Sequence, residues 1–529
     1  MQTLYIRPLP NVELSIVLLD WSCRESFHIF DDLDQQTIAR DRYELIWLEY
    51  FSRRPNEITL RIEHGTASPD VWGVMEMPED AYYHKHFIYN AGILLARGRI
   101  VVICDSDAMV NSTFVESILA AFELDEKIVL HLDEVRNVDR RHYPFDHPTV
   151  AEFLDGACKN WQSGMTSGLL NDIDVIHSRN YGACFCALKE DLIAIGGADE
   201  HIDYLGHVCG PYDLTFRLVN HGRREIWLKE EFLYHTWHPG AGGRNNYIGP
   251  HDGRYMSSRA LNARFTGRVM PYLENPAIAC YRDTGDLERS LAVLATAGGR
   301  RTAVDWRIDN ENRFLSLGRE AWYQKKFSSA VNYWERLAAV PEMRTSEVLG
   351  WLGWGRAGQR RFRKSVALFE EALRLDASNS WARCGLGRAL SSLGRDEEAL
   401  DCFESILDKA PEDYLAYRYA LEERGKLLFR RSSFAAALDD FKSLCELHEL
   451  YEKKSRCRMA CFRVGLCEMR LGNSEAAIAA FGKAGGNIAG NPHLSTLYLT
   501  VWYLLHGAAV RTLNLLRQVK RAATEFRGT

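Results

Sequence analysis

The sequence contains no apolar stretch as long as a membrane-spanning helix. Its longest apolar stretches, such as Leu14–Trp21 and Ile100–Cys104, have the length of β-strands, whereas a transmembrane helix takes about 20 residues. Residues 1–11 carry one arginine and lack an apolar segment ahead of a small-residue cleavage site, so they do not have the pattern of a secretory signal. We therefore expect a cytoplasmic protein without a transmembrane segment.

Paired cysteines are also absent. The thirteen cysteines are scattered, the closest two being Cys184 and Cys186, and none forms a C-x-x-C pair. This spacing excludes a zinc ribbon and a redox-active dithiol of the C-x-x-C type. We expect reduced and mostly buried thiols.

The charge of the chain is unevenly distributed. The 529 residues are 46% apolar and 26% charged, with a net charge of −6, which is a globular composition long enough for two to four domains. Residues 1–310 carry 31 basic against 45 acidic side chains, a net charge of −14, whereas residues 311–529 carry 34 against 26, a net charge of +8. Opposite charges suggest two parts with different roles. We expect no nucleic-acid ligand.

The second part repeats itself. Leu386-Gly387 and Phe403 recur, 34 residues upstream, as Leu352-Gly353 and Phe369. Related units, the later two with longer loops, are marked by the following residues: Gly318 and Trp334; Gly425 and Phe441; Gly465 and Phe481. These units resemble the tetratricopeptide repeat, in which small residues let two helices cross closely and an aromatic side chain fills the gap. With a terminal helix predicted over His493–Arg517, they indicate an all-α solenoid with a concave surface. A helical bundle of no repeat class is the alternative.

The first part alternates short apolar runs with helical segments, which indicates an α/β domain. Leu14–Leu19, Tyr43–Phe51 and Arg99–Cys104 are the strands that we predict first. The Gly/Arg-rich stretch Ala297–Arg301 is typical of a linker. We therefore divide the chain into an α/β domain (1–295), a linker (296–310) and a repeat domain (311–529).

The segment from Asn90 to Asp107 is the most informative for chemistry. A helix predicted to end at Gly98 leads into a buried strand, and Asp105-Ser106-Asp107 follows that strand directly. The carboxyl ends of parallel strands are where open α/β sheets bind ligands. Asp-x-Asp there offers oxygen ligands to a divalent ion, whose remaining positions a diphosphate would fill. The alternative is a solvated turn, with Asp107 capping a helix that begins near Ser112.

This stretch, with two further blocks, resembles family-2 glycosyltransferases of the GT-A fold over roughly residues 12–240. The second block is matched by Gly182–Leu188 and by Gly196-Gly197-Ala198-Asp199-Glu200, and the third by Tyr212-Asp213 and the helix after it. Tyr212 replaces the family's usual Glu, and Ala198 replaces its Phe. The resemblance implies an α/β GT-A domain with a Rossmann-like mixed sheet, followed here by the repeat solenoid.

The resemblance also implies site residues. Asp107 would bind the metal, and Asp213 would be the catalytic base, with a helix N-cap as its alternative role. Residues expected to contact the cofactor or donor are Asp20, Glu49, Asn90 and Asp105. His84–His86 are interpreted as a polar helix turn, from which Lys85 reaches toward a phosphate.

Two histidines follow the apolar run Ile226–Tyr234. We predict that His235, slightly ahead of His238, is an additional metal ligand, since GT-A enzymes often take a histidine from this point of the chain. An imidazole ligand suits Mn²⁺ better than Mg²⁺. The glycine-rich loop that follows carries Arg244, which would close over the diphosphate. A flexible surface loop without this role is equally compatible with the sequence.

The leading hypothesis is a metal-dependent, inverting glycosyltransferase. Its donor would be a nucleoside-diphosphate sugar, with a UDP-sugar favoured. The repeat domain would bind a protein, peptide or glycan acceptor, or a protein partner, in its groove. The alternatives are a scaffold with a degenerate transferase domain, and a nucleotidyltransferase. The latter is disfavoured because no glycine-rich phosphate loop lies near residue 20.

Overall fold

The computed structural model describes the following residues: 1–20, 22, 26–79, 81, 83–143, 147–156, 158–160, 181–201, 204, 212–238, 258–300, 314–408, 413–451 and 454–484. They form two compact units, an N-terminal unit that ends at Glu320 and a repeat unit that begins at Ala321. None of the helices in these ranges combines the length and the apolar character needed to cross a membrane.

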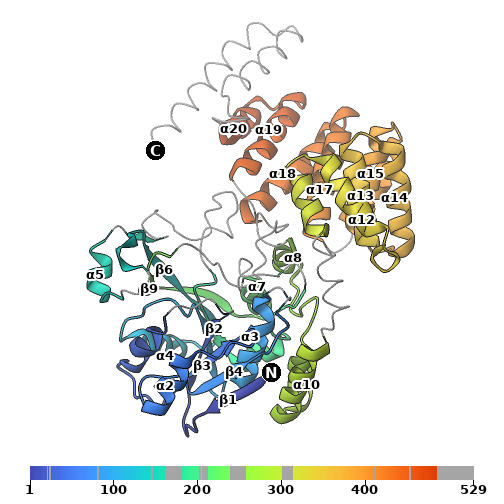
Figure 1. Ribbon diagram of the computed structural model, residues 1–529. Helices are drawn as coiled ribbons and strands as arrows, with labels where there is room; N and C mark the ends of the chain where they lie inside the picture. The colour runs from blue at the N-terminus through green and yellow to red at the C-terminus, as the bar shows by residue number, and fades with distance from the viewer. Residues whose placement is uncertain are drawn as a thin grey trace. The chain divides into compact units, whose positions relative to one another are not determined.

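The N-terminal unit is built around one mixed sheet (Figure 1). Its strands are β1 (Gln2–Ile6), β2 (Leu14–Asp20), β3 (Tyr43–Glu49), β4 (Val71–Val74), β5 (Ile100–Cys104), β6 (Ile128–Asn137), β7 (Cys158–Asn160), β8 (Cys184–Leu188) and β9 (Arg224–His235). Their order across the sheet is β1-β4-β3-β2-β5-β8-β6-β7, with β9 paired to β6. Strands β4, β3, β2 and β5 are parallel, and β8 is antiparallel to both β5 and β6. The predicted α/β class with a mixed sheet is confirmed.

Helices surround this sheet. They are α1 (Ile29–Asp34), α2 (Asn56–His64), α3 (Lys85–Leu95), α4 (Phe114–Leu124), α5 (Val150–Leu154), α6 (Lys189–Ala194), α7 (Tyr212–Asn220), α8 (Ser258–Thr266), α9 (Pro276–Thr284) and α10 (Leu287–Arg300), with a 3₁₀ turn at Arg140–His142. Residues 296–300, predicted to open the linker, are therefore the end of α10, and residues 301–313 lie outside the described ranges.

The central strands are buried throughout and mostly apolar because both faces of the sheet are covered. Val17 and Leu19 of β2 belong to a core that also contains residues of α3. Ile16 and Leu18 face the opposite core, to which α1 and α4 contribute. The period of two along a strand thus divides β2 between two helical layers.

Two glycines of the Asn90–Asp107 segment permit close packing of α3 on this sheet. A Cβ atom on Gly92 would lie 2.4 Å from Cγ1 of Val17, and one on Gly98 would lie 2.7 Å from the backbone nitrogen of Leu14. Any larger residue would push α3 and the following turn away from β2. The glycine spacing of the motif therefore brings the start of β5, and with it Asp105, to its place beside β2.

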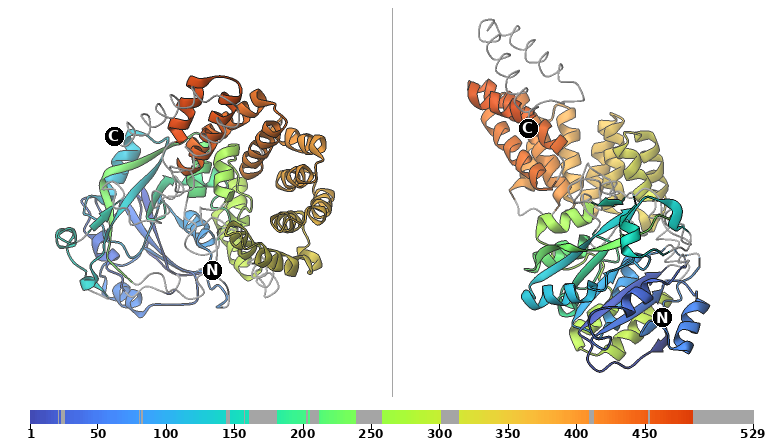
Figure 2. Two further views of the ribbon diagram at one scale, coloured as in Figure 1. Left: turned by 90° about the horizontal axis from the view of Figure 1, so that it is seen from above. Right: turned by 90° about the vertical axis from the view of Figure 1, so that its left-hand side faces the viewer.

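The repeat unit consists of paired antiparallel helices. They are α12 (Phe327–Ala338), α13 (Ser346–Gly358), α14 (Phe362–Leu375), α15 (Ser380–Ser392), α16 (Asp396–Leu407), α17 (Tyr414–Arg430), α18 (Phe434–Tyr451), α19 (Lys454–Arg470) and α20 (Ser474–Ala484), with a 3₁₀ turn at Pro341–Met343 and a further helix over 314–323 before α12. Figure 2 shows the pairs following one another along an arc. The helix predicted at His493–Arg517 lies outside the described residues.

Each repeat is closed by the predicted contact between a glycine and an aromatic ring. Four glycines on the first helices of successive pairs would each place a Cβ 2.6–2.8 Å from a phenylalanine ring sixteen residues later. These pairs are Gly353 with Phe369, Gly387 with Phe403, Gly425 with Phe441, and Gly465 with Phe481. The four rings are buried, so the small residue lets the helices approach and the ring fills the space that remains.

The last two repeats depart from the prediction. We expected their extra residues to lengthen loops, but α17, α18 and α19 have 17, 18 and 17 residues, whereas α13 to α16 have 12 to 14. The additional residues therefore extend helices by about one turn.

Candidate active site

Acidic side chains end three neighbouring parallel strands. Asp20 and Glu49 are the last residues of β2 and β3 and face each other in register, and Asp105 directly follows β5. Asp20 and Glu49 are fully buried. The Arg53 guanidinium lies 3.5 Å from Asp20, and the Trp47 indole N–H donates to Glu49 at 2.9 Å. The strand order β3-β2-β5 places all three carboxylates at one edge of the sheet.

The loop after β5 is fixed at several points. The Asp105 N–H donates to the carbonyl of Ala183 at 3.0 Å, and the Ser106 hydroxyl donates to the carbonyl of Leu19 at 2.8 Å. Met109 and Tyr234 exchange two backbone hydrogen bonds of 2.8 and 3.0 Å. The loop is thereby tied to the end of β9. Asp107 is not a helix cap, because α4 begins at Phe114 and its N-cap residue is Thr113.

Three candidate metal ligands meet here. Nε2 of His235 lies 3.3 Å from Oδ2 of Asp107, and Nε2 of His238 lies 3.4 Å from the same oxygen. The ligand atoms of all three side chains lie within 4.8 Å of one another. His235 is the last residue of β9, so its side chain is buried, whereas that of His238 is about one-third exposed. We predicted His235 as the ligand slightly ahead of His238. In the structure both histidines lie beside Asp107, so both are candidate ligands.

Burial and the neighbouring charges both shift the pKa values of this cluster. Burial raises the pKa of Asp105, as does the nearby Asp107, while Lys85 acts in the opposite direction with its Nζ 3.9 Å from Oδ1 of Asp105. Burial works against a positive charge on His235, but the Asp107 carboxylate outweighs it and raises the pKa of His235. Lys85 is the first residue of α3, so the polar helix turn that we predicted for His84–His86 is the start of this helix, and its side chains are buried.

Sequence reasoning missed a second histidine pair beside the cluster. The rings of His28 and His147 stack with centroids 3.7 Å apart, and the Ser26 hydroxyl lies 3.3 Å from Nδ1 of His28 and 2.7 Å from Nε2 of His147. Burial lowers the pKa of His28 to about 3, with a further contribution from His147. The negative charge of Asp107 acts in the opposite direction, toward a higher pKa of His28. The two histidines are 119 residues apart in the chain, and no local pattern connects them.

The contacts of Asn90 within the protein argue against the cofactor-binding role that we predicted. Its side-chain N–H groups donate to the Ala198 carbonyl and to the Glu200 carboxylate, each at 2.9 Å, and its oxygen accepts from the Ala198 N–H at 2.7 Å. The side chain is fully buried. Glu200 also accepts from Asn275 at 2.5 Å. Asn90 therefore fastens α3 to the Gly-Gly-Ala-Asp-Glu segment, and its amide has no free N–H group for a ligand.

Asp213 is likewise engaged within the protein. Arg217, four residues later on α7, donates to Oδ2 of Asp213 at 2.7 Å, and the Tyr204 hydroxyl donates to Oδ1 at 3.0 Å. Asp213 and Arg217 are both essentially inaccessible to solvent. Arg217 also donates to the carbonyls of Ile195 and Gly197. This arrangement argues against Asp213 as the catalytic base and favours a role in fastening α7 to Tyr204 and, through Arg217, to Ile195 and Gly197. Asp213 is not an N-cap either, because it lies inside α7.

Arg244, predicted to close over the diphosphate, lies outside the described residues.

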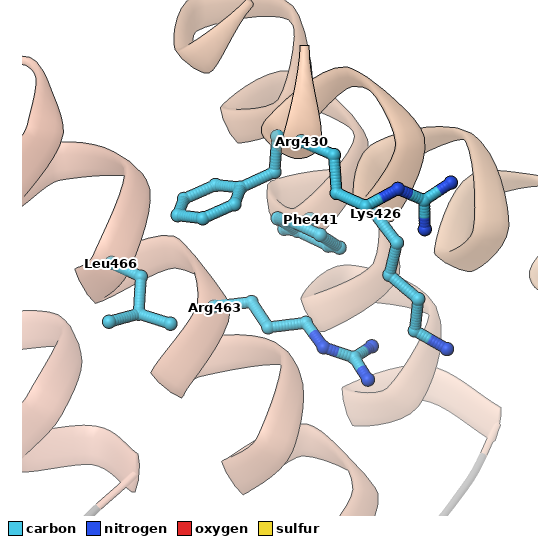
Figure 3. Close-up of a pocket in the computed structure, with 6 residues that line it drawn as sticks. Lys426, Arg430, Phe441, Arg463 and Leu466 are labelled. Carbon is cyan, nitrogen blue, oxygen red and sulfur yellow. The ribbon is translucent and has the colours of Figure 1, made fainter. Parts of the chain in front are cut away.

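The repeat unit has a cavity of its own. It measures about 300 Å³ and is lined by Lys426, Phe429, Arg430, Phe441, Arg463 and Leu466. Figure 3 shows the charged ends of the three basic side chains pointing to the same side of the cavity, with Leu466 at the other. Glu422 partly neutralises them, because it lies 2.7 Å from Lys426 and 3.0 Å from Arg463.

The sequence of the repeat unit matches two family models described as tetratricopeptide repeat, over residues 357–423 and 422–492. No curated protein matches the chain. The family models confirm the repeat class that the glycine and aromatic spacing predicts.

Several solved structures are similar to parts of the chain. MamA from Desulfovibrio magneticus is 18% identical, with a TM-score of 0.27, over 33% of this chain and 93% of that one. A tetratricopeptide repeat protein from Parabacteroides merdae is 18% identical, with a TM-score of 0.30, over 40% and 80%. S. aureus TarS in complex with UDP-GlcNAc is 12% identical, with a TM-score of 0.34, over 73% and 92%.

Proposed function

We propose that this chain, whose C-terminal half contains a tetratricopeptide-repeat array, carries a metal-dependent glycosyltransferase in its N-terminal unit. One observation supports this most: Asp105 and Asp107 meet His235, His238 and Lys85 at the carboxyl edge of the sheet. A carboxylate and two imidazoles can bind a divalent ion, and a lysine beside them complements a diphosphate. The three blocks that resemble family-2 glycosyltransferases contain or flank these residues.

The donor set fits a first-row divalent ion. Asp107, His235 and His238 would hold the ion, and Mn²⁺ is favoured over Mg²⁺ because two of the three ligands are imidazoles. When bound, the ion neutralises the charge that develops on the leaving diphosphate. Lys85 would donate to a phosphate oxygen from the start of α3. The buried carboxylates of Asp20 and Glu49 would accept hydrogen bonds from the nucleoside, which we propose to be uridine.

The reaction class follows from the way in which the site would bind the donor. A site that binds a nucleoside diphosphate through the metal and Lys85 leaves the anomeric carbon open to an acceptor hydroxyl or amine. A single displacement there would invert the anomeric configuration. The acceptor must lose a proton to a protein base, and the engaged carboxylate of Asp213 is poorly placed to accept it.

The reaction can be tested with the full-length protein, a panel of sugar nucleotides and Mn²⁺. We expect Mn²⁺-dependent release of the nucleoside diphosphate, reduced at least about 100-fold in Asp107→Asn. Asp41→Asn, the same change at an exposed position before β3, should be unaffected. Release of pyrophosphate from a nucleoside triphosphate supplied together with a sugar 1-phosphate would identify a nucleotidyltransferase instead. A folded protein that neither binds nor hydrolyses any sugar nucleotide would support the scaffold alternative.

We further propose that the repeat unit binds the acceptor, a protein or peptide in preference to a free glycan, or a protein partner. Tetratricopeptide arrays present an extended concave surface, and the cavity on α17–α19 offers cationic and aromatic side chains together. Arg430→Glu should raise the KM for a peptide acceptor without changing donor hydrolysis, whereas Lys364→Glu, on an exposed face of α14, should change neither. An unchanged KM in Arg430→Glu would remove the cavity from acceptor binding.

The eleven described cysteines carry free thiols, which supports our proposal that the protein works in the reducing cytoplasm.

A further inference from the structure

Three cysteines that are scattered in the sequence converge between α18 and α19. Cys445 lies on α18, and Cys457 and Cys461 lie on α19. The Sγ atom of Cys461 lies 3.4 Å from that of Cys445 and 3.8 Å from that of Cys457. All three Sγ atoms lie within 4.8 Å of one another. Cys461 is buried and the other two are partly exposed, so an ion can enter from solvent.

A carboxylate lies beside one of the three thiols. Oε1 of Glu449, on α18, lies 3.7 Å from Sγ of Cys457. Cys445 and Glu449 are four residues apart on one helix, and Cys457 and Cys461 are four residues apart on the other. Residues at this spacing share one helix face, so two pairs of candidate ligands face each other across the helix contact.

The extra helical turns of these repeats supply half of the group. Aligning α18 with α14 on Phe441 and Phe369 shows that α18 is longer at its C-terminal end. The additional residues are 448–451, and they include Glu449. Aligning α19 with α13 on Gly465 and Gly353 shows that α19 is longer at its N-terminal end. The additional residues are 454–457, and they include Cys457. The lengthened helices thus bring a carboxylate and a thiol to a place that the shorter repeats lack.

Three of the separations within this group are close to those of tetrahedral coordination. With Zn–S bonds of about 2.3 Å, two sulfur ligands of a tetrahedral zinc ion lie about 3.8 Å apart. The same geometry with a Zn–O bond of about 2.1 Å separates sulfur from oxygen by about 3.6 Å. The Cys461–Cys445 and Cys461–Cys457 sulfur separations of 3.4 and 3.8 Å, and the 3.7 Å between Cys457 and Glu449, are close to these values. A disulfide would use only two of the three thiols.

We propose that Cys445, Cys457 and Cys461 form a thiolate site for Zn²⁺, with Glu449 as the fourth ligand, that fastens the end of α18 to the start of α19. Binding displaces the three thiol protons to solvent and forms three Zn–S bonds without a change of oxidation state. The site lies in the repeat unit and does not depend on the proposed transferase.

The test uses reduced, metal-free, full-length protein titrated with Co²⁺ and then with Zn²⁺. Cobalt bound by thiolates has a near-ultraviolet sulfur-to-metal charge-transfer band, which the aspartate and histidine ligands of the N-terminal unit cannot produce. We expect this band to reach saturation at one equivalent of Co²⁺ per chain in the full-length protein. It should disappear when Zn²⁺ displaces the cobalt. It should be lost in Cys461→Ser and Cys457→Ser and kept in the matched control Cys402→Ser, a thiol on α16 outside the group.

A second measurement uses the unaltered protein and therefore does not depend on whether the variants fold. In the unaltered protein, Zn²⁺ should slow alkylation of Cys445, Cys457 and Cys461 while leaving Cys402 unchanged, as read by mass spectrometry of the peptides. The proposal is overturned if the unaltered protein shows no thiolate band, if the band persists in both serine variants, or if Zn²⁺ leaves the alkylation rates of the three thiols unchanged.

Discussion

At the scale of single residues, the Asp107–His235 pair controls when the candidate metal site is available. Asp107 raises the pKa of His235 above its ordinary value of 6.5, and a metal ion binds only the neutral imidazole. Protons therefore compete with the metal as soon as the pH falls below this raised pKa. His28 does not take part in this competition, because its pKa is lowered to about 3.

We predict that Mn²⁺ affinity falls about tenfold per pH unit once the pH is below the pKa of His235, and that the fall begins above pH 6.5. Isothermal titration of Mn²⁺ across the neutral range measures the slope. His64→Asn, a change at an exposed histidine of α2, should leave the slope as it is. An affinity that does not vary with pH in this range would show that His235 is not a ligand.

Asp213 provides a second test at this scale, because its two possible roles predict opposite results. Removing one partner of a buried ion pair costs about 3–5 kcal/mol, and Arg217 would lose its carboxylate in Asp213→Asn. We expect a clear drop in the melting temperature of the N-terminal unit. Asp125→Asn, the same change in the solvent-screened pair with Arg224, should lower the melting temperature much less. An unchanged melting temperature together with a loss of transfer would restore Asp213 as the base.

Local sequence patterns predicted some site residues and not others. Asp105, Asp107 and His235 directly follow or end buried strands, and His238 comes three residues later, so the strands position them and their chemistry can be inferred from the sequence. Asn90 and Asp213 lie in motifs just as clear. Their roles depend on partners, such as Glu200 and Arg217, that only tertiary packing or helix geometry brings to them. His28 and His147 are distant in sequence and carry no shared pattern.

At the scale of elements, the glycine–phenylalanine contacts explain why the repeats could be recognised. Gly387 and Phe403 are constrained together, since a Cβ on the glycine would lie 2.8 Å from the ring. Such mutual constraint appears in the sequence as a fixed spacing. The lengthened helices α17–α19 carry no such mark, and the thiols of Cys445, Cys457 and Cys461 could not be grouped from their separations alone.

We predict that two glycine-to-alanine changes have opposite effects on stability. Gly387→Ala introduces a methyl group against a buried ring and should cost about 1–3 kcal/mol. Gly482→Ala, within α20, meets no atom within 4 Å and should gain about 0.5–1 kcal/mol through helix propensity. Thermal unfolding followed by helical circular dichroism compares the two. Equal shifts in the same direction would contradict the packing role of Gly387.

At the scale of the whole molecule, two units of different composition share one chain. The acidic first part, with a net charge of −14, contains the carboxylate edge of the sheet, and the basic second part, with +8, contains the repeats. The cavity on α17–α19 adds cationic side chains to the repeat unit. These features support a division of labour in which the N-terminal unit binds the donor and the repeat unit binds the acceptor or a partner.

The central claim is that Asp107, His235 and His238 hold one divalent ion that a sugar nucleotide joins. Electron paramagnetic resonance of Mn²⁺ titrated into the full-length protein tests it directly, because Mn²⁺ prefers oxygen and imidazole ligands and avoids the thiolate cluster. We predict one bound Mn²⁺ per chain, bound more tightly in the presence of UDP, with binding lost in Asp107→Asn and in His235→Asn. The account would be contradicted if the unaltered protein bound no Mn²⁺. It would also be contradicted if both variants bound Mn²⁺ as tightly as the unaltered protein does, with and without UDP.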